Sequence, residues 1–99
     1  MKNIYLLIAY DVSTESSEGR RRLRKIAQTC TNYGQRVQKS IFECLVSETE
    51  YTTLKHQLLR EIDEAEDSLR IYRLRDHSEK TVQHYGINKP IDYTRPLIL

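Results

Sequence analysis

The stretch that decides the fold is residues 3–10, NIYLLIAY, which is followed directly by Asp11. It is a nearly continuous apolar run rich in residues that favour β-structure. Such a run is typical of a central strand covered on both faces. Because the run ends at a carboxylate, we expect Asp11 to lie at the carboxyl end of this strand, where open α/β sheets place their functional groups.

A helix is predicted over residues 18–32, after a polar loop in which Ser16 or Ser17 can serve as the N-cap. Apolar residues recur there at helical spacing and form one stripe, namely Leu23, Ile26, Ala27, Cys30 and Tyr33. Gly34 follows and is predicted to end the helix as a glycine C-cap. This helix therefore presents one apolar face to the central strand.

Residues 36–46 have the composition of β-structure but are about twice as long as a mean strand. We therefore expect a bend or tight hairpin near residues 39–40. The next four residues form a capping box, with Ser47 as the cap and Glu50 reaching back to it. A second helix is predicted from there to about residue 62.

A further strand is predicted over residues 68–75, and a last short strand within 91–99. Residues 76–90 are predicted to be loop or tail. The order β-α-β-β-α-β indicates an α+β ferredoxin-like fold over residues 1–76, with a C-terminal tail and strand over 77–99. Right-handed crossovers place both helices on one face of the sheet, so the other, apolar face predicts a homodimer.

The composition excludes several classes of protein. The chain has 99 residues, 38% hydrophobic and 30% charged, which predicts one domain with a thin core. A pocket of about 300 Å³ for a small organic ligand is not expected inside it, and neither is a small-molecule cofactor. The longest apolar run is too short for a membrane span, and no signal-peptide pattern is seen, so we expect a cytoplasmic protein with reduced thiols at Cys30 and Cys44.

Charge is distributed unevenly along the chain. Residues 1–47 carry eight basic and four acidic side chains, which gives +4, whereas residues 48–75 carry five and seven, which gives −2. The candidate nucleic-acid-binding positions are Tyr10 and a basic cluster, namely Arg20, Arg21, Arg22, Arg24, Lys25, Arg36 and Lys39. This cluster is either a phosphate-binding surface or a solvated helix face, and the sequence pattern alone favours neither.

Asp11 is the sharpest single feature. A carboxylate beside a basic patch is the group that would hold Mg²⁺ or Mn²⁺ for phosphodiester chemistry, and a twofold axis near Asp11 would supply a second carboxylate. The alternative is a simple loop-start aspartate. The other acidic cluster, residues 61–67, lacks the order of a calcium loop and is predicted to be a solvated turn. His56, His77 and His84 lack zinc-ligand spacing and are expected at the surface.

Four segments together resemble the CRISPR-associated protein 2 family. They are Tyr10-Asp11-Val12, the stretch GRRRLRK at 19–25, the stretch YGQRVQKSIFE at 33–43 and the stretch DSLRIY at 67–72. The segment at 34–43 is the most specific of the four. The tail after residue 76 is much less diagnostic.

The resemblance implies a ferredoxin-like homodimer in which residues 36–46 form a hairpin and the C-terminal strand packs on the partner. It implies a metal-dependent endonuclease with Asp11 as the catalytic metal ligand, and a central DNA-holding dimer bound to the integrase subunit, CRISPR-associated protein 1. Tyr10, Arg36 and Phe42 match family motif positions, and the arginines of the first helix match as a group. For Phe42 we favour core packing over base stacking.

Three interpretations remain open from the sequence. In the first, the protein is an endonuclease that uses Mg²⁺ or Mn²⁺ at Asp11. In the second, it is a DNA-binding assembly scaffold for the integrase with no chemistry at Asp11. In the third, it is a ferredoxin-like regulatory dimer that binds a small ligand. A membrane partner is not expected in any of them.

Overall fold

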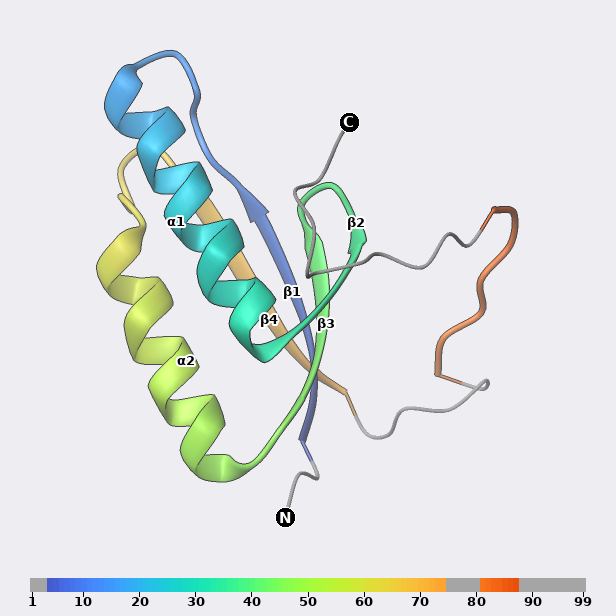
Figure 1. Cartoon of the computed structure of the whole chain (residues 1–99). Coiled ribbons are helices and arrows are strands. Elements are labelled where there is room, and N and C mark those ends of the chain that lie inside the picture. Colours follow the sequence, from blue (N-terminus) through green and yellow to red (C-terminus); the bar gives the residue numbers. More distant parts are fainter. Residues whose placement is uncertain (1–3, 75–80, 88–99) are drawn as a thin grey trace.

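The computed structural model describes residues 4–74 and 81–87. Four strands form one sheet and two helices pack against it (Figure 1). The elements are β1 (Ile4–Asp11), α1 (Ser17–Tyr33), β2 (Gly34–Gln38), β3 (Ile41–Val46), α2 (Glu48–Glu61) and β4 (Ser68–Leu74). The predicted strand within 91–99 lies outside the described residues, and the division into 1–76 and 77–99 stays a prediction.

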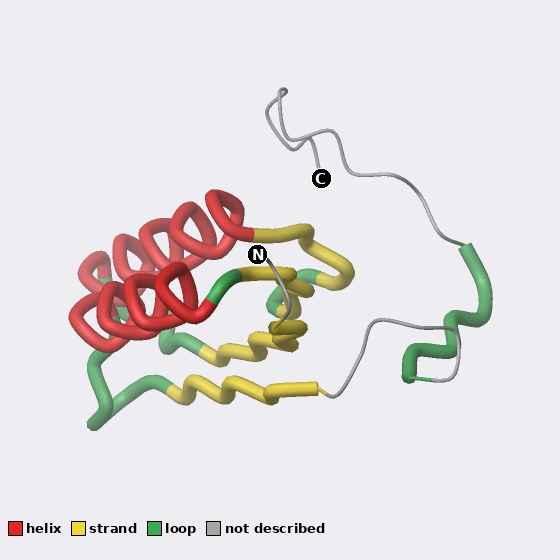
Figure 2. The backbone as a smooth tube through the Cα atoms, turned by 90° about the horizontal axis from the view of Figure 1, so that it is seen from below, coloured by secondary structure: helices red, strands yellow, loops and turns green. Residues whose placement is uncertain are grey.

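The sheet has the strand order β2-β3-β1-β4, and every neighbouring pair is antiparallel. Figure 2 shows both helices on one side of the strands. This is the predicted ferredoxin-like arrangement, with the apolar run of residues 4–11 as a central strand. No helix among residues 4–74 and 81–87 is long and apolar enough to cross a membrane.

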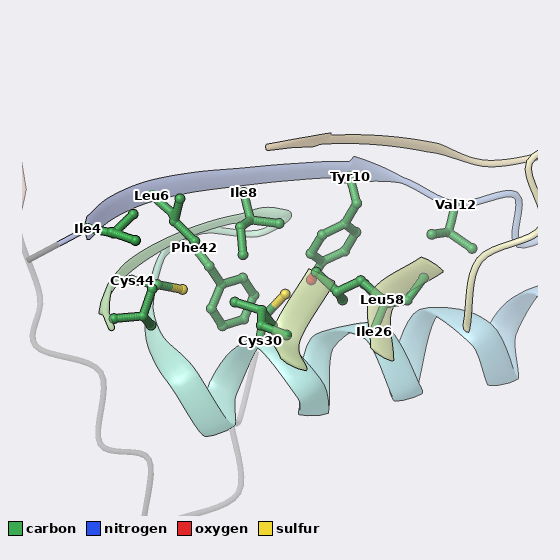
Figure 3. Close-up of a cluster of buried hydrophobic side chains, with 12 residues drawn as sticks. Ile4, Leu6, Ile8, Tyr10, Val12, Ile26, Cys30, Phe42, Cys44 and Leu58 are labelled. Carbon is green, nitrogen blue, oxygen red and sulfur yellow. The ribbon is translucent and has the colours of Figure 1, made fainter. Parts of the chain in front are cut away.

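The two faces of the sheet follow the alternation of β1. Its even-numbered residues point toward the helices and form the core together with side chains from α1, β3 and α2 (Figure 3). Its odd-numbered residues therefore point to the opposite face, which neither helix covers and which we call the open face. Tyr5 is nevertheless buried there, Leu7 and Ala9 are half-buried, and Asp11 is exposed.

Helix α1 begins and ends at the predicted cap residues. The Ser16 hydroxyl caps it by accepting a hydrogen bond from the Gly19 N–H at 3.0 Å. Gly34 is the C-cap, as predicted, and its N–H donates to the Cys30 carbonyl; its φ of −164° is extended backbone, and it is also the first residue of β2. A Cβ at this position would overlap the carbonyl oxygen of Glu43, so the glycine is needed for close strand packing.

The hairpin predicted near residues 39–40 is confirmed. Strands β2 and β3 are joined by Lys39 and Ser40, and the register shifts between Arg36 and Gln38, which leaves Val37 as a bulge.

The capping box predicted at the start of the second helix is confirmed as well. The Ser47 hydroxyl accepts from the Glu50 N–H at 3.1 Å, while the Glu50 carboxylate accepts from the Ser47 N–H at 3.0 Å.

Candidate nucleic-acid and metal site

Asp11 is the last residue of the central strand β1 and is exposed on the open face. It lies opposite Ser68 of β4 in the sheet register. On its other side, the Tyr10 N–H donates to the Ser40 carbonyl at 3.1 Å, which places the β2–β3 hairpin loop next to this end of β1. Among the described residues, the side chain of Asp11 makes no hydrogen bond or ion pair. Its carboxylate is therefore available to an external ligand.

The loop that follows Asp11 is held by Asp67. One carboxylate oxygen of Asp67 accepts from the Ser13 N–H at 3.2 Å, and the other accepts from the Asp63 N–H at 2.9 Å. Arg22 donates to both oxygens, from Nε at 2.8 Å and from Nη2 at 3.2 Å. We call Asp67, Arg22, Ser13 and Asp63 the loop clasp. Hydrogen bonding from Arg22 holds the pKa of Asp67 below its ordinary value, and the two backbone N–H groups act in the same direction.

The loop clasp corrects two predictions. Residues 61–67 were predicted to be a solvated turn, but the Asp67 side chain is 0% exposed and binds three separate segments. Arg22 was predicted to bind nucleic acid, but its side chain is only 17% exposed and is paired with Asp67 and, at 3.2 Å, with Glu66. Nothing in the local sequence marks this pair, because its partners are 45 positions apart.

The remaining basic residues of α1 form an exposed surface. Arg20, Arg21, Arg24 and Lys25 are all exposed and lie on the outer side of the helix, away from the buried stripe. Arg20 donates to the Thr14 carbonyl at 3.1 Å. The other three make no hydrogen bond or ion pair within the described part of the chain. We call these four residues the α1 basic face.

Tyr10 and Arg36 are not on that surface. Tyr10 was predicted to bind nucleic acid, but it is a core residue with 6% exposure, and its ring stacks against Phe42 with centroids 6.2 Å apart. Figure 3 shows its side chain directed toward Ile26 and Leu58. Arg36 is half-buried over the Phe42 ring, 5.1 Å from its centroid. Burial raises the pKa of Tyr10, and the Arg36 charge opposes that rise.

Phe42 itself is fully buried, which agrees with core packing rather than base stacking. Lys39 is exposed in the hairpin loop beside the Asp11 end of the sheet. Tyr10 was misassigned because a motif position does not say which face of a strand a side chain occupies, whereas nucleic-acid binding by the half-buried Arg36 stays a prediction.

Arg70 was not singled out from the sequence as a site residue, yet the structure places it near Asp11. It is exposed on β4, opposite Ala9 and two residues from Ser68, the register partner of Asp11. It therefore shares the open face with Asp11, and it donates to the Tyr72 hydroxyl at 3.2 Å. The available signal was the alternation of polar residues 68, 70 and 72 along one face of the strand.

The donor set suits a hard divalent cation but is incomplete in one chain. No group of three or more His, Cys, Asp or Glu side chains that could hold a metal occurs within residues 4–74 and 81–87. Mg²⁺ is commonly held by one or two carboxylates, with waters and substrate phosphates completing its octahedron. An exposed carboxylate with no internal partner fits that pattern, so Asp11 is a suitable ligand.

The cysteines and histidines are the remaining side chains that could carry chemistry. Cys30 and Cys44 are buried free thiols, and burial raises the pKa of Cys30 to about 12 and that of Cys44 to about 11. His56 and His84 are exposed, as expected, and His77 lies outside the described residues.

A groove of about 350 Å³ opens at the surface between the end of α1, β2 and β3. A pocket of about 300 Å³ was not expected, on the argument that the core is too small. The groove is compatible with that argument because it lies outside the core, along the edge of the sheet. Its lining is Tyr5, Tyr33, Gly34, Gln35, Glu43, Cys44 and Leu45.

Comparison with known proteins places the chain in a family. Residues 4–82 match the model of the family described as CRISPR associated protein Cas2. The chain is 58% identical to the CRISPR-associated endoribonuclease Cas2 1 of Moorella thermoacetica, over 97% of this chain and 100% of that protein. It is 54% identical to the CRISPR-associated endonuclease Cas2 of Halalkalibacterium halodurans, over 94% and 97%.

A solved structure supports the same assignment. The crystal structure of Streptococcus pyogenes Cas2 at pH 6.5 superimposes with a TM-score of 0.73 and 46% identity, covering 83% of this chain and 99% of that one. The sequence motifs, the ferredoxin-like fold and these matches agree with one another. The chain therefore belongs to the CRISPR associated protein Cas2 family.

Proposed function

We propose that this chain is a metal-dependent endonuclease of CRISPR adaptation that works as a homodimer and binds nucleic acid through the α1 basic face. The observation that carries the proposal is the position of Asp11. Its carboxylate is exposed at the end of the central strand and has no partner among the residues that the structure describes, and the neighbouring helix carries four exposed cations. Two close relatives are named as an endoribonuclease and an endonuclease, which supports the same activity here.

The homodimer supplies what one chain lacks. A single chain contributes one Asp11, whereas two chains related by a twofold axis would contribute two carboxylates to one cation. The open face supports such a dimer because it carries partly exposed apolar side chains, including Leu45 at 48% and Tyr72 at 42% exposure. Leu7, Ala9 and Ile41 extend the same apolar surface.

The dimer can be tested by sedimentation. Leu45→Glu places a charge on the open face, and we expect it to shift the protein toward monomer. Leu59→Glu is the matched control, because Leu59 is 44% exposed but lies on α2, away from the open face. A wild-type protein that sediments as a monomer at micromolar concentration, or an equal effect of both variants, would contradict the proposed interface.

In the proposed mechanism, the two Asp11 carboxylates of the dimer would together hold one Mg²⁺ or Mn²⁺. When bound, such a cation polarises the phosphodiester and lowers the pKa of an attacking water. Within the chain, the α1 basic face binds the phosphates, and Lys39 and Arg70 are the cationic side chains on the hairpin loop and β4 next to Asp11. The loop clasp fixes the chain that follows Asp11.

The test of the activity is Asp11→Asn, which keeps the size of the side chain but removes its charge. We expect metal-dependent cleavage to fall to background while nucleic-acid binding persists. Glu15→Gln is the control, because Glu15 is an exposed carboxylate in the loop directly after β1. If purified Asp11→Asn protein cleaves at the wild-type rate, Asp11 is not the catalytic metal ligand.

The second candidate is a DNA-binding scaffold for the integrase subunit, CRISPR-associated protein 1, with no chemistry at Asp11. One observation favours it specifically. The described residues contain four exposed cations on α1 but no cluster of three metal ligands. The discriminating experiment is spacer integration reconstituted with Asp11→Asn protein. Full integration with the variant would support the scaffold, and loss of integration would support the catalytic role.

A cytoplasmic location is part of the proposal. It is supported by the two free thiols, because unpaired buried cysteines are typical of a reducing compartment.

A further inference from the structure

Each oxygen of the Asp67 carboxylate accepts two hydrogen bonds. One oxygen accepts from the Ser13 N–H and from Arg22 Nη2, and the other accepts from the Asp63 N–H and from Arg22 Nε, all between 2.8 and 3.2 Å. The Asp67 side chain therefore joins its own loop to two consecutive segments that lie about 50 positions earlier in the sequence, so that three segments meet there. They are the β1–α1 loop, helix α1 and the α2–β4 loop.

This side chain is close to Asp11 along two independent paths. Ser13, whose N–H is bound by Asp67, follows Asp11 by two residues. Ser68, which follows Asp67 directly, is the register partner of Asp11 in the sheet. A movement at Asp67 would therefore reach Asp11 both through the loop after β1 and through the adjoining strand.

The loop is also confined from its other side. A Cβ at Gly19 would overlap the Ser13 carbonyl oxygen, so the first turn of α1 packs directly against the backbone of this loop. Both backbone groups of Ser13 are therefore held, because its N–H donates to Asp67 and its carbonyl packs against Gly19. The strand end that carries Asp11 thus enters a fixed segment rather than a free loop.

We propose that Asp67, with Arg22 as its counter-ion, is a positioning residue that fixes the β1–α1 loop and so orients the Asp11 carboxylate toward its ligand. This inference rests on the proposed function, since it gives Asp67 a role in the chemistry assigned to Asp11. Asp67 touches neither a reacting group nor a ligand. It acts through the backbone of Ser13 and Ser68.

Glu66 provides the contrast that separates positioning from simple charge pairing. It contacts the same Arg22 at 3.2 Å, but its side chain is 54% exposed and, within residues 4–74 and 81–87, makes no hydrogen bond to the β1–α1 loop. Removing the Glu66 charge therefore weakens the electrostatics of Arg22 and leaves the Ser13 hydrogen bond intact. Removing the Asp67 carboxylate affects both.

The experiment compares Asp67→Asn, Asp67→Ala and the control Glu66→Gln in the full-length chain. Hydrogen exchange of the Ser13 amide, measured by NMR without metal, reports the loop directly. We expect exchange to accelerate about tenfold in Asp67→Ala, as for loss of one buried hydrogen bond, and to be unchanged in Glu66→Gln. Asp67→Asn keeps the shape of the side chain and guards against failure of the alanine variant to fold.

Cleavage kinetics report the consequence. We expect kcat to fall on the order of 10²-fold in the Asp67 variants, as for a misplaced catalytic group, while KM for nucleic acid changes less than about twofold because the α1 basic face is untouched. Ser47→Ala is the stability control. It removes the N-cap of α2. Ser47 follows Val46, which pairs with Ile4 at the end of β1 opposite to Asp11, so the substitution should leave kcat unchanged.

The outcomes are distinguishable. Unchanged Ser13 exchange in both Asp67 variants overturns the inference, and so does unchanged kcat when exchange is faster. An equal loss of kcat in Ser47→Ala shows that stability rather than positioning is responsible, which also overturns it. If wild-type cleavage does not depend on Asp11, the proposed function fails, while the Ser13 exchange still decides whether Asp67 holds the loop.

Discussion

Removal of two cations from the α1 basic face should change how nucleic-acid binding depends on salt. In Arg21→Gln/Lys25→Gln, both altered side chains are exposed, lie one helical turn apart and have no internal partner among the described residues. The substitution therefore costs no ion pair within the fold. Whatever binding is lost must come from contacts with the ligand.

The magnitude follows from counterion release. Each phosphate contact contributes about 0.9 to the slope of log K against log salt, so two contacts contribute about 1.8. Between about 50 and 200 mM salt, a change of about 0.6 in log salt, the double variant should lose roughly 1.1 log units less affinity than the wild type. The assay is a titration of labelled duplex DNA by fluorescence anisotropy at several salt concentrations.

A matched control removes the same charges from the other helix. Lys55→Gln/Arg60→Gln also removes one lysine and one arginine, both exposed, but from α2. Its net charge equals that of the α1 variant, so a general field effect would be equal in the two proteins. We expect its salt slope to remain close to the wild-type value. Equal changes of slope in both variants, or no change in the α1 variant, would refute the assignment of the α1 basic face.

Three further predictions concern stability. Gly34→Ala should lower the free energy of unfolding by about 2–3 kcal/mol, measured by urea titration, because its Cβ would overlap the Glu43 carbonyl oxygen; an effect below about 0.5 kcal/mol would show that the strands can separate there at little cost. Phe42→Ala should cost about 3–5 kcal/mol in the same assay because the ring is fully buried, and a wild-type midpoint would contradict the core assignment. Burial raises the pKa of Cys30 to about 12 and that of Cys44 to about 11, whereas unfolded thiols ionise near pH 8.5. The thiol contribution to the free energy of unfolding should therefore be full below about pH 8 and decline as pH rises toward the folded pKa values. The check is to compare the pH dependence of stability with that of Cys→Ala variants and to measure thiol alkylation rates. Rapid alkylation of the native protein at pH 8 would contradict the prediction.

Local patterns predicted much of the fold. The apolar stripe of α1, the capping box of α2 and the excess length of residues 36–46 each led to the element that the structure contains. These signals are local because helix periodicity, capping and strand length depend on neighbours within a few positions. Gly34 shows their limit. It is the C-cap that the sequence predicted, but its extended conformation and its contact with Glu43 on another strand could not be read from the local pattern.

The candidate site was predicted less completely. Asp11 was identified correctly as an exposed residue at a strand end, because the apolar run before it is visible in the sequence. Tyr10 was assigned to nucleic-acid binding from its motif position beside Asp11, and Arg22 from its place among other arginines. The structure buries the first in the core and pairs the second with Asp67. A sequence neighbour of a functional residue points to the opposite face of a strand, so proximity along the chain misleads there.

The sequence by itself determined the order of the elements, the family of the chain, the charge of α1 and the carboxylate at the end of the central strand. These properties depend on residue type and on spacing within a few positions. Only the tertiary structure decided which cations are free, that Arg70 shares a face with Asp11, and that Asp67 joins three segments. The physical reason is that strand register and long-range ion pairs join residues tens of positions apart, and no local pattern records such contacts.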